Sequence, residues 1–273
     1  MIYSREFSIE TTNNDYLDTF GSLSNAKSKC FNIGAGTWEH PCWTNIDLKP
    51  QSEAFAKIQA PCIYHDLVKS NQLPIKADSA LMIYSSHVIE HLPDKNVIEL
   101  IKSSFNSLKK GGIIRITTGP NAETDFNALK RKDKKWWYFY NDNPFNCLPD
   151  PKEKISLYDY WLLHFASPRS VYSPTPSNKK YSGFEIKDLL AKYSNDRIYL
   201  QNIFTDSLEF NINYPGNHLS WWSPKKLMKI LIETGFSSAS SCAFGQSSNY
   251  LFRDTRYFDN TYPQISMYVE AIK

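Results

Sequence analysis

The sequence predicts an α/β fold: a mostly parallel, seven-stranded sheet with an antiparallel edge strand and an inserted helical cap. Short apolar strands alternate with helical segments over residues 29–118, the pattern of a parallel sheet covered by helices. Two glycines follow the first of these strands, and an acid, Asp47, ends the second. The alternation breaks over residues 119–219, a stretch too long to be a structureless loop inside a compact domain.

The strands and core helices can be placed in order along the chain. Strands are expected at 30–33, 44–47, 62–65, 80–85 and 112–118, and an antiparallel pair at 237–244 and 265–272. Apolar residues recur at helical spacing after Pro93, and residues 109–112 (Lys-Lys-Gly-Gly) predict the end of that helix. Ser223 and Pro224 predict the start of another helix, which Gly235 ends.

The segment that breaks the alternation is interpreted as an inserted cap. It is rich in Trp, Tyr, Pro, Asn and Lys, and helices are expected near 158–165 and 184–193. Residues 1–28 are expected to form an arm or one helix over the core. The predicted organisation is a first core part, the cap and a second core part, at 1–122, 123–215 and 216–273.

The glycines and the acid describe a nucleoside-binding crevice at the carboxyl ends of parallel strands. Gly34 and Gly36 let the backbone approach a ligand where a side chain would block it. Asp47 can accept hydrogen bonds from both hydroxyls of a ribose. The dinucleotide fingerprint needs a third glycine where this chain has Glu39, an anion at the place of a pyrophosphate. A nucleoside without phosphate, such as S-adenosylmethionine, suits this pattern better.

Four motifs in order resemble the Rossmann-like S-adenosylmethionine-dependent methyltransferases. They lie at 31–37 (Phe-Asn-Ile-Gly-Ala-Gly-Thr), 45–48 (Asn-Ile-Asp-Leu), 64–67 (Tyr-His-Asp-Leu) and 78–92, and the helix end and strand at 109–116 follow. The missing first helix and the Trp-x-Asn-Ile-Asp second strand look most like a bacterial subgroup of predicted methyltransferases. Members of that subgroup often accompany surface-polysaccharide synthesis. The resemblance implies a methyltransferase fold with S-adenosyl-L-methionine as cofactor.

The resemblance also implies how the cofactor is held. Asp66 would accept from the adenine amino group, Leu67 would lie against the base, and Ser85 would lie near the methionine end. The predicted cofactor-binding residues are Gly34, Ala35, Gly36, Asp47, Leu48, His65, Asp66, Leu67, Ser85 and Ser86. Simpler interpretations stay open: Asp47 as a surface acid, and Asp66 or Ser86 as an N-cap.

Methyl transfer from a sulfonium needs alignment more than acid–base chemistry, because the leaving group departs neutral. An acceptor that must lose a proton needs a base, and histidine titrates in the right range. His87, where the fourth strand opens into the crevice, is the predicted catalytic residue. The other candidates are His164, His218, Tyr172 and Tyr181.

Residues 87–91 also match H-x-x-E-H, a zinc-protease pattern in which two histidines four apart on a helix share a metal. Only three positions of this pattern are fixed, so chance matches are common. It follows a parallel strand and adenosine-binding motifs, which a zinc protease does not require. The resemblance instead implies inward packing of His91 and Leu92, so no metal is expected.

Composition limits the partners and the location. The net charge is +3 over 273 residues, which by itself indicates no polyanionic partner. Five scattered cysteines without a C-x-x-C pair favour a reducing compartment. No apolar run approaches about 18 residues, and the N-terminus lacks signal-peptide features. We therefore expect a cytoplasmic protein without membrane association. For the methyltransferase, the predicted acceptor is a small molecule or a sugar.

Two other functions stay open. Residues 130–140 mix cations with aromatics, a combination that can bind single-stranded nucleic acid, so an RNA methyltransferase is one alternative. The simpler interpretation, which we prefer, is a charged start to an aromatic-packed cap helix. The second alternative is a nucleoside-binding module without transfer activity. Salt-dependent RNA binding would favour the former, and cofactor binding without turnover the latter.

Overall fold

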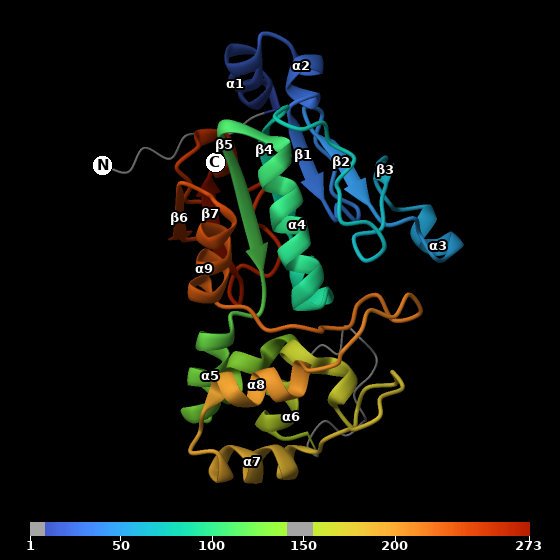
Figure 1. The fold of residues 1–273 in the computed structure, drawn as a ribbon, viewed down its shortest axis with the longest axis vertical. Helices are drawn as coiled ribbons and strands as arrows, with labels where there is room; N and C mark the ends of the chain where they lie inside the picture. Colours follow the sequence, from blue (N-terminus) through green and yellow to red (C-terminus); the bar gives the residue numbers. More distant parts are fainter. Residues whose placement is uncertain (1–8, 141–154) are drawn as a thin grey trace. The chain divides into compact units, whose positions relative to one another are not determined.

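The computed structural model describes residues 9–140 and 155–273, which divide into two compact units (Figure 1). The sheet unit comprises Met1–Val88, Ile98–Thr117 and Pro224–Lys273. The helical unit comprises Ile89–Val97 and Thr118–Ser223. The division passes through helix α4 (Asp94–Ser107), whose first turn belongs to the helical unit. That the helical unit acts as a cap stays a prediction.

The sheet unit is built on a seven-stranded sheet in the order β3-β2-β1-β4-β5-β7-β6. The strands are β1 (Cys30–Ile33), β2 (Thr44–Asp47), β3 (Ile63–Tyr64), β4 (Ala80–Ser86), β5 (Leu108–Thr118), β6 (Ser238–Cys242) and β7 (Met267–Ile272). The pairs among β1 to β5 are parallel, whereas β6 and β7 pair antiparallel at one edge. The predicted mostly parallel sheet with an antiparallel edge is therefore confirmed.

Five helices accompany the strands of the sheet unit among the described residues: α1 (Ile9–Phe20), α2 (Leu23–Lys27), α3 (Glu53–Ala56), most of α4, and α9 (Pro224–Thr234). An aromatic cluster fills one face of the sheet, where Trp43 Nε1 donates to Tyr16 Oη at 2.6 Å and Tyr84 lies edge-on to Phe258. This cluster holds α1 against the sheet. The N-terminal region thus forms two helices, where the sequence predicts an arm or one helix.

The predicted end of α4 was wrong. The helix ends at Ser107, and residues 109–112 belong to β5. Leu108 pairs with Ala80, and the backbone N–H of Gly111 donates to Lys273 O at 2.8 Å. The register between β4 and β5 shifts here, so the glycines serve a bulge in the strand instead of a helix end.

The helical unit contains α5 (Ala122–Lys130), α6 (Leu157–Ala166), α7 (Gly183–Lys192) and α8 (Arg197–Thr205), with the 3₁₀ turns η1 (Ile89–His91), η2 (Lys134–Tyr140) and η4 (Ser167–Arg169). α6 is buried along most of its length and contacts α5, α7 and α8. Capping boxes begin α6 at Ser156 and α7 at Ser182. These two helices match the predicted ones, whereas α5 and α8 were not predicted.

No helix of the described residues has the length and apolar character needed to cross a membrane. The four cysteines in these residues are unpaired; they are Cys30, Cys42, Cys62 and Cys242. Cys147 lies outside the described residues.

Candidate functional site

The strand order reverses direction between β1 and β4, which makes their carboxyl ends the place where open α/β sheets bind ligands. Ile33 at the end of β1 pairs with Ser85 of β4 and with Ile46 of β2. Asp47 at the end of β2 pairs with Tyr64 of β3. All the predicted cofactor-binding residues and His87 lie at or just beyond these strand ends, within the sheet unit.

The two glycines after β1 have different environments. Both have positive φ angles, 71° at Gly34 and 56° at Gly36. A Cβ atom on Gly34 would lie 2.1 Å from Val88 Cγ2, so packing of the chain itself requires this glycine. A Cβ on Gly36 would meet nothing within 4 Å. Gly36 therefore faces open space, as a backbone that a ligand approaches would, while Ala35 between them is buried.

Asp47 is held by the glycine turn beside it. Its Oδ2 accepts from Gly36 N at 2.6 Å, and its Oδ1 accepts from Leu48 N at 2.6 Å. The backbone N–H of His65 donates to Asp47 O at 2.8 Å, which ties the next strand end to the same residue. Each carboxylate oxygen can accept a further hydrogen bond. Asp47 is therefore more than a surface acid: its carboxylate is oriented, and it can receive two more donors.

Beyond β3, the side chains of His65 and Asp66 differ in their hydrogen bonding. His65 Nε2 is buried without a hydrogen-bond partner among the described residues, and burial lowers the pKa of this ring. Asp66 Oδ1 accepts from Val68 N at 2.9 Å, and Lys69 Nζ lies 3.2 Å from Asp66 Oδ2. Asp66 thus caps a local turn at Leu67. A contact of Asp66 with adenine stays a prediction.

At the end of β4, Ser85 and Ser86 also differ. Ser85 Oγ is buried without a partner among the described residues. Ser86 Oγ accepts from Thr117 Oγ1 of β5 at 2.8 Å. A buried hydroxyl normally has a hydrogen-bond partner, so Ser85 Oγ is a group that a bound ligand could satisfy.

His87 is tied to the segment that precedes β7. Its Nε2 lies 3.0 Å from Thr261 O and 2.9 Å from Ser266 Oγ. A carbonyl only accepts, so we assign the hydrogen to Nε2, which leaves the lone pair of the neutral ring on Nδ1. His87 has φ of 54°, and its backbone N–H donates to Thr117 O at 2.9 Å.

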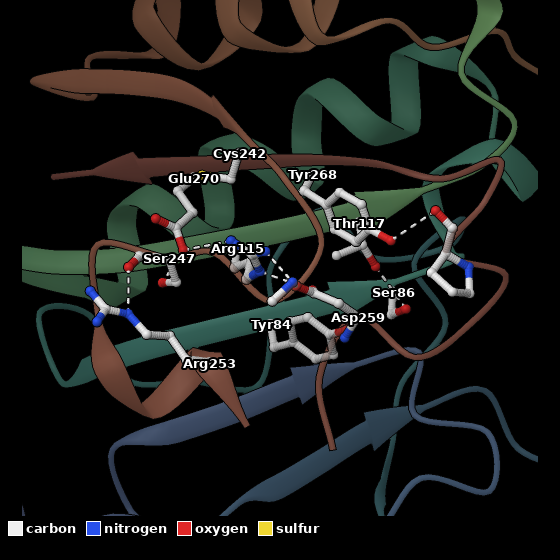
Figure 2. A network of polar contacts seen from close by, with 12 residues as sticks. Tyr84, Ser86, Arg115, Thr117, Cys242, Ser247, Arg253, Asp259, Tyr268 and Glu270 are labelled. Carbon is white, nitrogen blue, oxygen red and sulfur yellow. Dashed lines mark hydrogen bonds and ion pairs between the residues drawn. The ribbon is translucent and has the colours of Figure 1, made fainter. Parts of the chain in front are cut away.

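A buried ion network fixes the segment before β7, which contains the two hydrogen-bond partners of His87. Figure 2 shows this network. Arg115 of β5 donates from Nε to Asp259 Oδ1 at 2.9 Å and from Nη1 to Glu270 Oε1 at 2.7 Å. All three side chains are at most 2% exposed. Asp259 N donates to Tyr84 Oη at 2.8 Å, so the network joins β4, β5 and β7. Because Asp259 lies two residues before Thr261, this network positions the partners of His87.

The two acids of the network respond differently to burial. Burial raises the pKa of Asp259, although Arg115 acts in the opposite direction. Burial alone would also raise the pKa of Glu270, but hydrogen bonds from Ser247 and Ser248 and the charge of Arg115 hold it below its usual value. No sequence motif marks this network, because its members come from distant parts of the chain.

The two described aromatic side chains of 130–140, Trp136 and Trp137, make contacts within the helical unit. Trp137 is 1% exposed in the core of this unit, and Trp136 Nε1 donates to Asp125 Oδ1 at 2.7 Å. The second oxygen of Asp125 lies 2.6 Å from His164 Nδ1. Both His164 and Tyr181 are buried, which disfavours them as exposed bases. The side chains of 138–140 lie outside the described residues.

The other histidine candidate, His218, lies close to Glu90 and His91 of η1. Ligand atoms of Glu90, His91 and His218 lie within 4.8 Å of one another. Residues 87–91 do not form an α-helix, because only Ile89–His91 make a 3₁₀ turn. The helical geometry of H-x-x-E-H is therefore absent. Burial, and then the neighbouring His91, lowers the pKa of His218 to about 3.

The helical unit also has an open pocket of about 400 Å³. Its lining mixes both charges and amides with one aromatic ring and one aliphatic side chain: Glu123, Phe126, Asn127, Lys130, Asn195, Asp196, Arg197 and Ile198. Such a surface suits a small polar molecule.

No protein-family model matches the sequence, and no curated protein matches it. Similar solved structures include S-adenosylmethionine-dependent methyltransferases of Archaeoglobus fulgidus (13% identity, 97% of this chain and 95% of that chain, TM-score 0.41) and Mesorhizobium loti (15% identity, 90% of each chain, TM-score 0.41). A Thermotoga maritima protein, described as such a methyltransferase and a possible histamine N-methyltransferase, covers 97% of this chain and 98% of its own (13% identity, TM-score 0.40). The α/β fold assignment rests on the strand order of this chain.

Proposed function

We propose that the protein is an S-adenosylmethionine-dependent methyltransferase that binds its cofactor at the carboxyl ends of β1, β2 and β4. The observation that carries the proposal is the oriented carboxylate of Asp47, anchored by Gly36 N and Leu48 N beside an open glycine turn. An acid in this position suits the two hydroxyls of a ribose. Glu39, at the third position of the dinucleotide fingerprint, argues against a pyrophosphate.

The residues at this edge fit a nucleoside with a polar tail. Asp47 would accept from the ribose, and Asp66 and Leu67 would contact the adenine. His65 Nε2 and Ser85 Oγ, which have no hydrogen-bond partner among the described residues, would gain hydrogen bonds. When bound, S-adenosylmethionine supplies a methyl group on a sulfonium.

Our proposal gives His87 the role of base for an acceptor that must lose a proton. Thr261 O and Ser266 Oγ beside its Nε2 orient the ring that would take the proton. The Arg115 network supports this role indirectly, because it fixes the segment that carries Thr261. The partners of Nε2 would also stabilise the resulting imidazolium.

We infer that the acceptor is a small polar molecule or a sugar. The pocket of the helical unit supports this inference, because Glu123, Lys130 and Arg197 offer hydrogen bonds around the ring of Phe126. An RNA acceptor finds less support, since Trp136 and Trp137 are already engaged within the unit. The link to surface polysaccharides and a cytoplasmic location stay predictions.

Calorimetry with S-adenosylhomocysteine, NAD and ATP tests the cofactor. We expect one S-adenosylhomocysteine per chain and far weaker binding of the other two. Asp47→Asn should weaken binding by about tenfold to a hundredfold, as expected for losing a charged partner of buried hydroxyls at about 1.5–3 kcal/mol. Asp18→Asn is the matched control, because it makes the same chemical change at an exposed position of the same unit.

Equal affinity of Asp47→Asn and the control, in folded proteins, would reduce Asp47 to a structural acid. Tighter binding of NAD than of S-adenosylhomocysteine would overturn the cofactor assignment.

Transfer of radiolabelled methyl groups to monosaccharides, nucleotide sugars and an RNA oligomer tests the acceptor class. We expect turnover with a member of the first two classes, and protection of Lys130 from trypsin by that acceptor. Salt-sensitive turnover of the RNA alone would favour the nucleic-acid alternative. Cofactor binding with no turnover in any class would favour the binding module.

A further inference from the structure

Outside the proposed cofactor site, the helical unit brings together Glu90 and His91 of η1 and His218 from the segment before α9. One ligand atom from each lies within 4.8 Å of the other two. This is the only cluster of its kind among the residues that the structure describes. Proteins commonly use two imidazoles and a carboxylate to bind a divalent metal.

The backbone around the cluster is fastened on both sides. Leu219 N donates to Glu90 O at 2.7 Å, which places His218 next to η1. On the other side, His218 N donates to Ser167 Oγ at 3.0 Å, and Ser167 N donates to His218 O at 3.1 Å. The three side chains therefore meet because their main chains are fixed.

Each histidine has a backbone carbonyl beside its Nδ1. His91 Nδ1 lies 3.1 Å from Asn217 O, and His218 Nδ1 lies 2.6 Å from His164 O. Because a carbonyl only accepts, we assign the hydrogen of each ring to Nδ1 and the lone pair to Nε2. Metal-bound histidines almost always donate their other ring N–H to a carbonyl or carboxylate in this way.

The carboxylate has a similar support. Glu90 is 2% exposed, and its Oε2 accepts from Thr118 Oγ1 at 2.8 Å. A buried carboxylate is costly unless it is paired or hydrogen-bonded. The hydroxyl of Thr118 orients the group, and a bound cation would offset its charge.

We propose that Glu90, His91 and His218 form a binding site for a divalent transition-metal ion of the zinc class. Ligands of tetrahedral zinc lie about 3.3–3.5 Å apart, so the ligand atoms must approach one another by at most about 1.5 Å, a shift that side-chain rotations supply. Three protein ligands leave a coordination position for water or an exogenous oxygen or nitrogen ligand. The expectation of no metal concerned His87 with His91; in this site His218 replaces His87.

Metal titration of the full chain, first stripped with a chelator, tests the site independently of methyl transfer. The probe is Co²⁺, followed by its visible absorption and displaced by Zn²⁺. We expect one ion per chain, and at least tenfold weaker binding in His218→Gln and in Glu90→Gln, where the amide can still accept from Thr118. His87→Gln is the matched control, because it removes the remaining member of the H-x-x-E-H pattern and should leave metal affinity unchanged.

No stoichiometric binding by the folded chain would overturn the proposal. An equal loss of affinity in His87→Gln would also overturn it, because His87 and His91 would then bind the metal as the H-x-x-E-H pattern describes. If His218→Gln does not fold, X-ray absorption of the Zn²⁺-loaded wild-type protein decides instead. Two imidazoles and at least one oxygen in the coordination shell support the site, and fewer than two imidazoles contradict it.

Discussion

The proposed cofactor site of the sheet unit and the polar groups of the helical unit are assembled by different routes. In the sheet unit, residues that follow consecutive strands come together, as Gly36, Asp47 and His65 do through direct hydrogen bonds. In the helical unit, the close groups come from distant segments, as in the pair Asp125 and His164 or the cluster at His218. Parallel strands end at one edge, so topology alone gathers the first set. Helix packing gives no such rule, so the second set has no signature in the sequence.

The units also differ in what stabilises their interiors. The sheet unit buries a full ion network around Arg115. Both units have a buried aromatic core, in the helical unit around Trp161 and Phe204. They differ in their buried charges: the helical unit buries the pair Asp125 and His164, whereas in the sheet unit one cation, Arg115, contacts two carboxylates. The loss of a single buried charge should therefore matter most at Arg115.

The largest effect is expected from Arg115→Met. The substitution leaves Asp259 and Glu270 buried without their cation, which costs about 3–5 kcal/mol of unfolding free energy. Urea unfolding measures this. Lys102→Met, which removes an exposed cation of α4 paired with Glu99, is the control and should cost less than about 1 kcal/mol.

Replacing all three members of the network, as Arg115→Met with Asp259→Leu and Glu270→Leu, should recover part of the loss, because no unpaired charge stays buried. A loss below about 1 kcal/mol for Arg115→Met alone would show that the comparison between the units is wrong.

The next effect separates packing from ligand approach at the glycine turn. Alanine at either position costs about 1–2 kcal/mol for a positive φ. Gly34→Ala should cost about 1–3 kcal/mol more, because its Cβ meets Val88. Gly36→Ala should instead weaken S-adenosylhomocysteine binding, since its Cβ enters open space. Thermal unfolding and calorimetry measure the two quantities.

Val88→Ala provides the control for this pair. In that background the extra cost of Gly34→Ala should shrink, while the cost of Gly36→Ala should not change. Equal costs of Gly34→Ala in both backgrounds would remove Val88 from the explanation.

Two strands could be predicted closely, because a glycine turn follows the first and an acid ends the second. Cys30–Ile33 and Thr44–Asp47 have the predicted bounds. The end of α4 could not be predicted, because the lysines and glycines of 109–112 are typical of a helix end. Only the pairing of Leu108 with Ala80 and of Gly111 with Lys273 assigns this stretch to β5. At this point the hydrogen bonds of the sheet override the local tendency of the sequence to end a helix.

The same limit applies to the candidate sites. The placement of Asp47 and Ser85 at one edge follows from strand order, which motifs indicate. The anchors of His87 at Thr261 and Ser266 lie far along the chain, and no motif marks them. In the helical unit, Asn121 and Asp196 are the N-caps of α5 and α8, and these two residues could have predicted where the helices begin. Nothing in the sequence pairs His218 with Glu90.

The smallest effect concerns pH and one histidine in each unit: His40, which is buried, and His218, which is partly buried. Burial lowers the pKa of His40 in the sheet unit to about 4 and that of His218 in the helical unit to about 3. His40 Nδ1 accepts from Cys42 N at 3.1 Å, whereas His218 Nδ1 donates to His164 O. Both rings are therefore held neutral, with the lone pair on opposite nitrogens.

Below the unfolded pKa of about 6.5, the unfolded chain binds protons at these histidines that the folded chain does not, so stability falls as pH falls. Each contributes a slope of at most about 1.4 kcal/mol per pH unit, down to its folded pKa. His40→Gln and His218→Gln should each remove one such slope from urea unfolding measured between pH 6.5 and 5, with chelator present. Asp259, whose pKa burial raises, contributes in the opposite sense but equally in all three proteins, so the differences report the histidines. An unchanged slope in His218→Gln beside a reduced slope in His40→Gln would mean that His218 is protonated in the folded state, and that of these two histidines only His40 is held neutral.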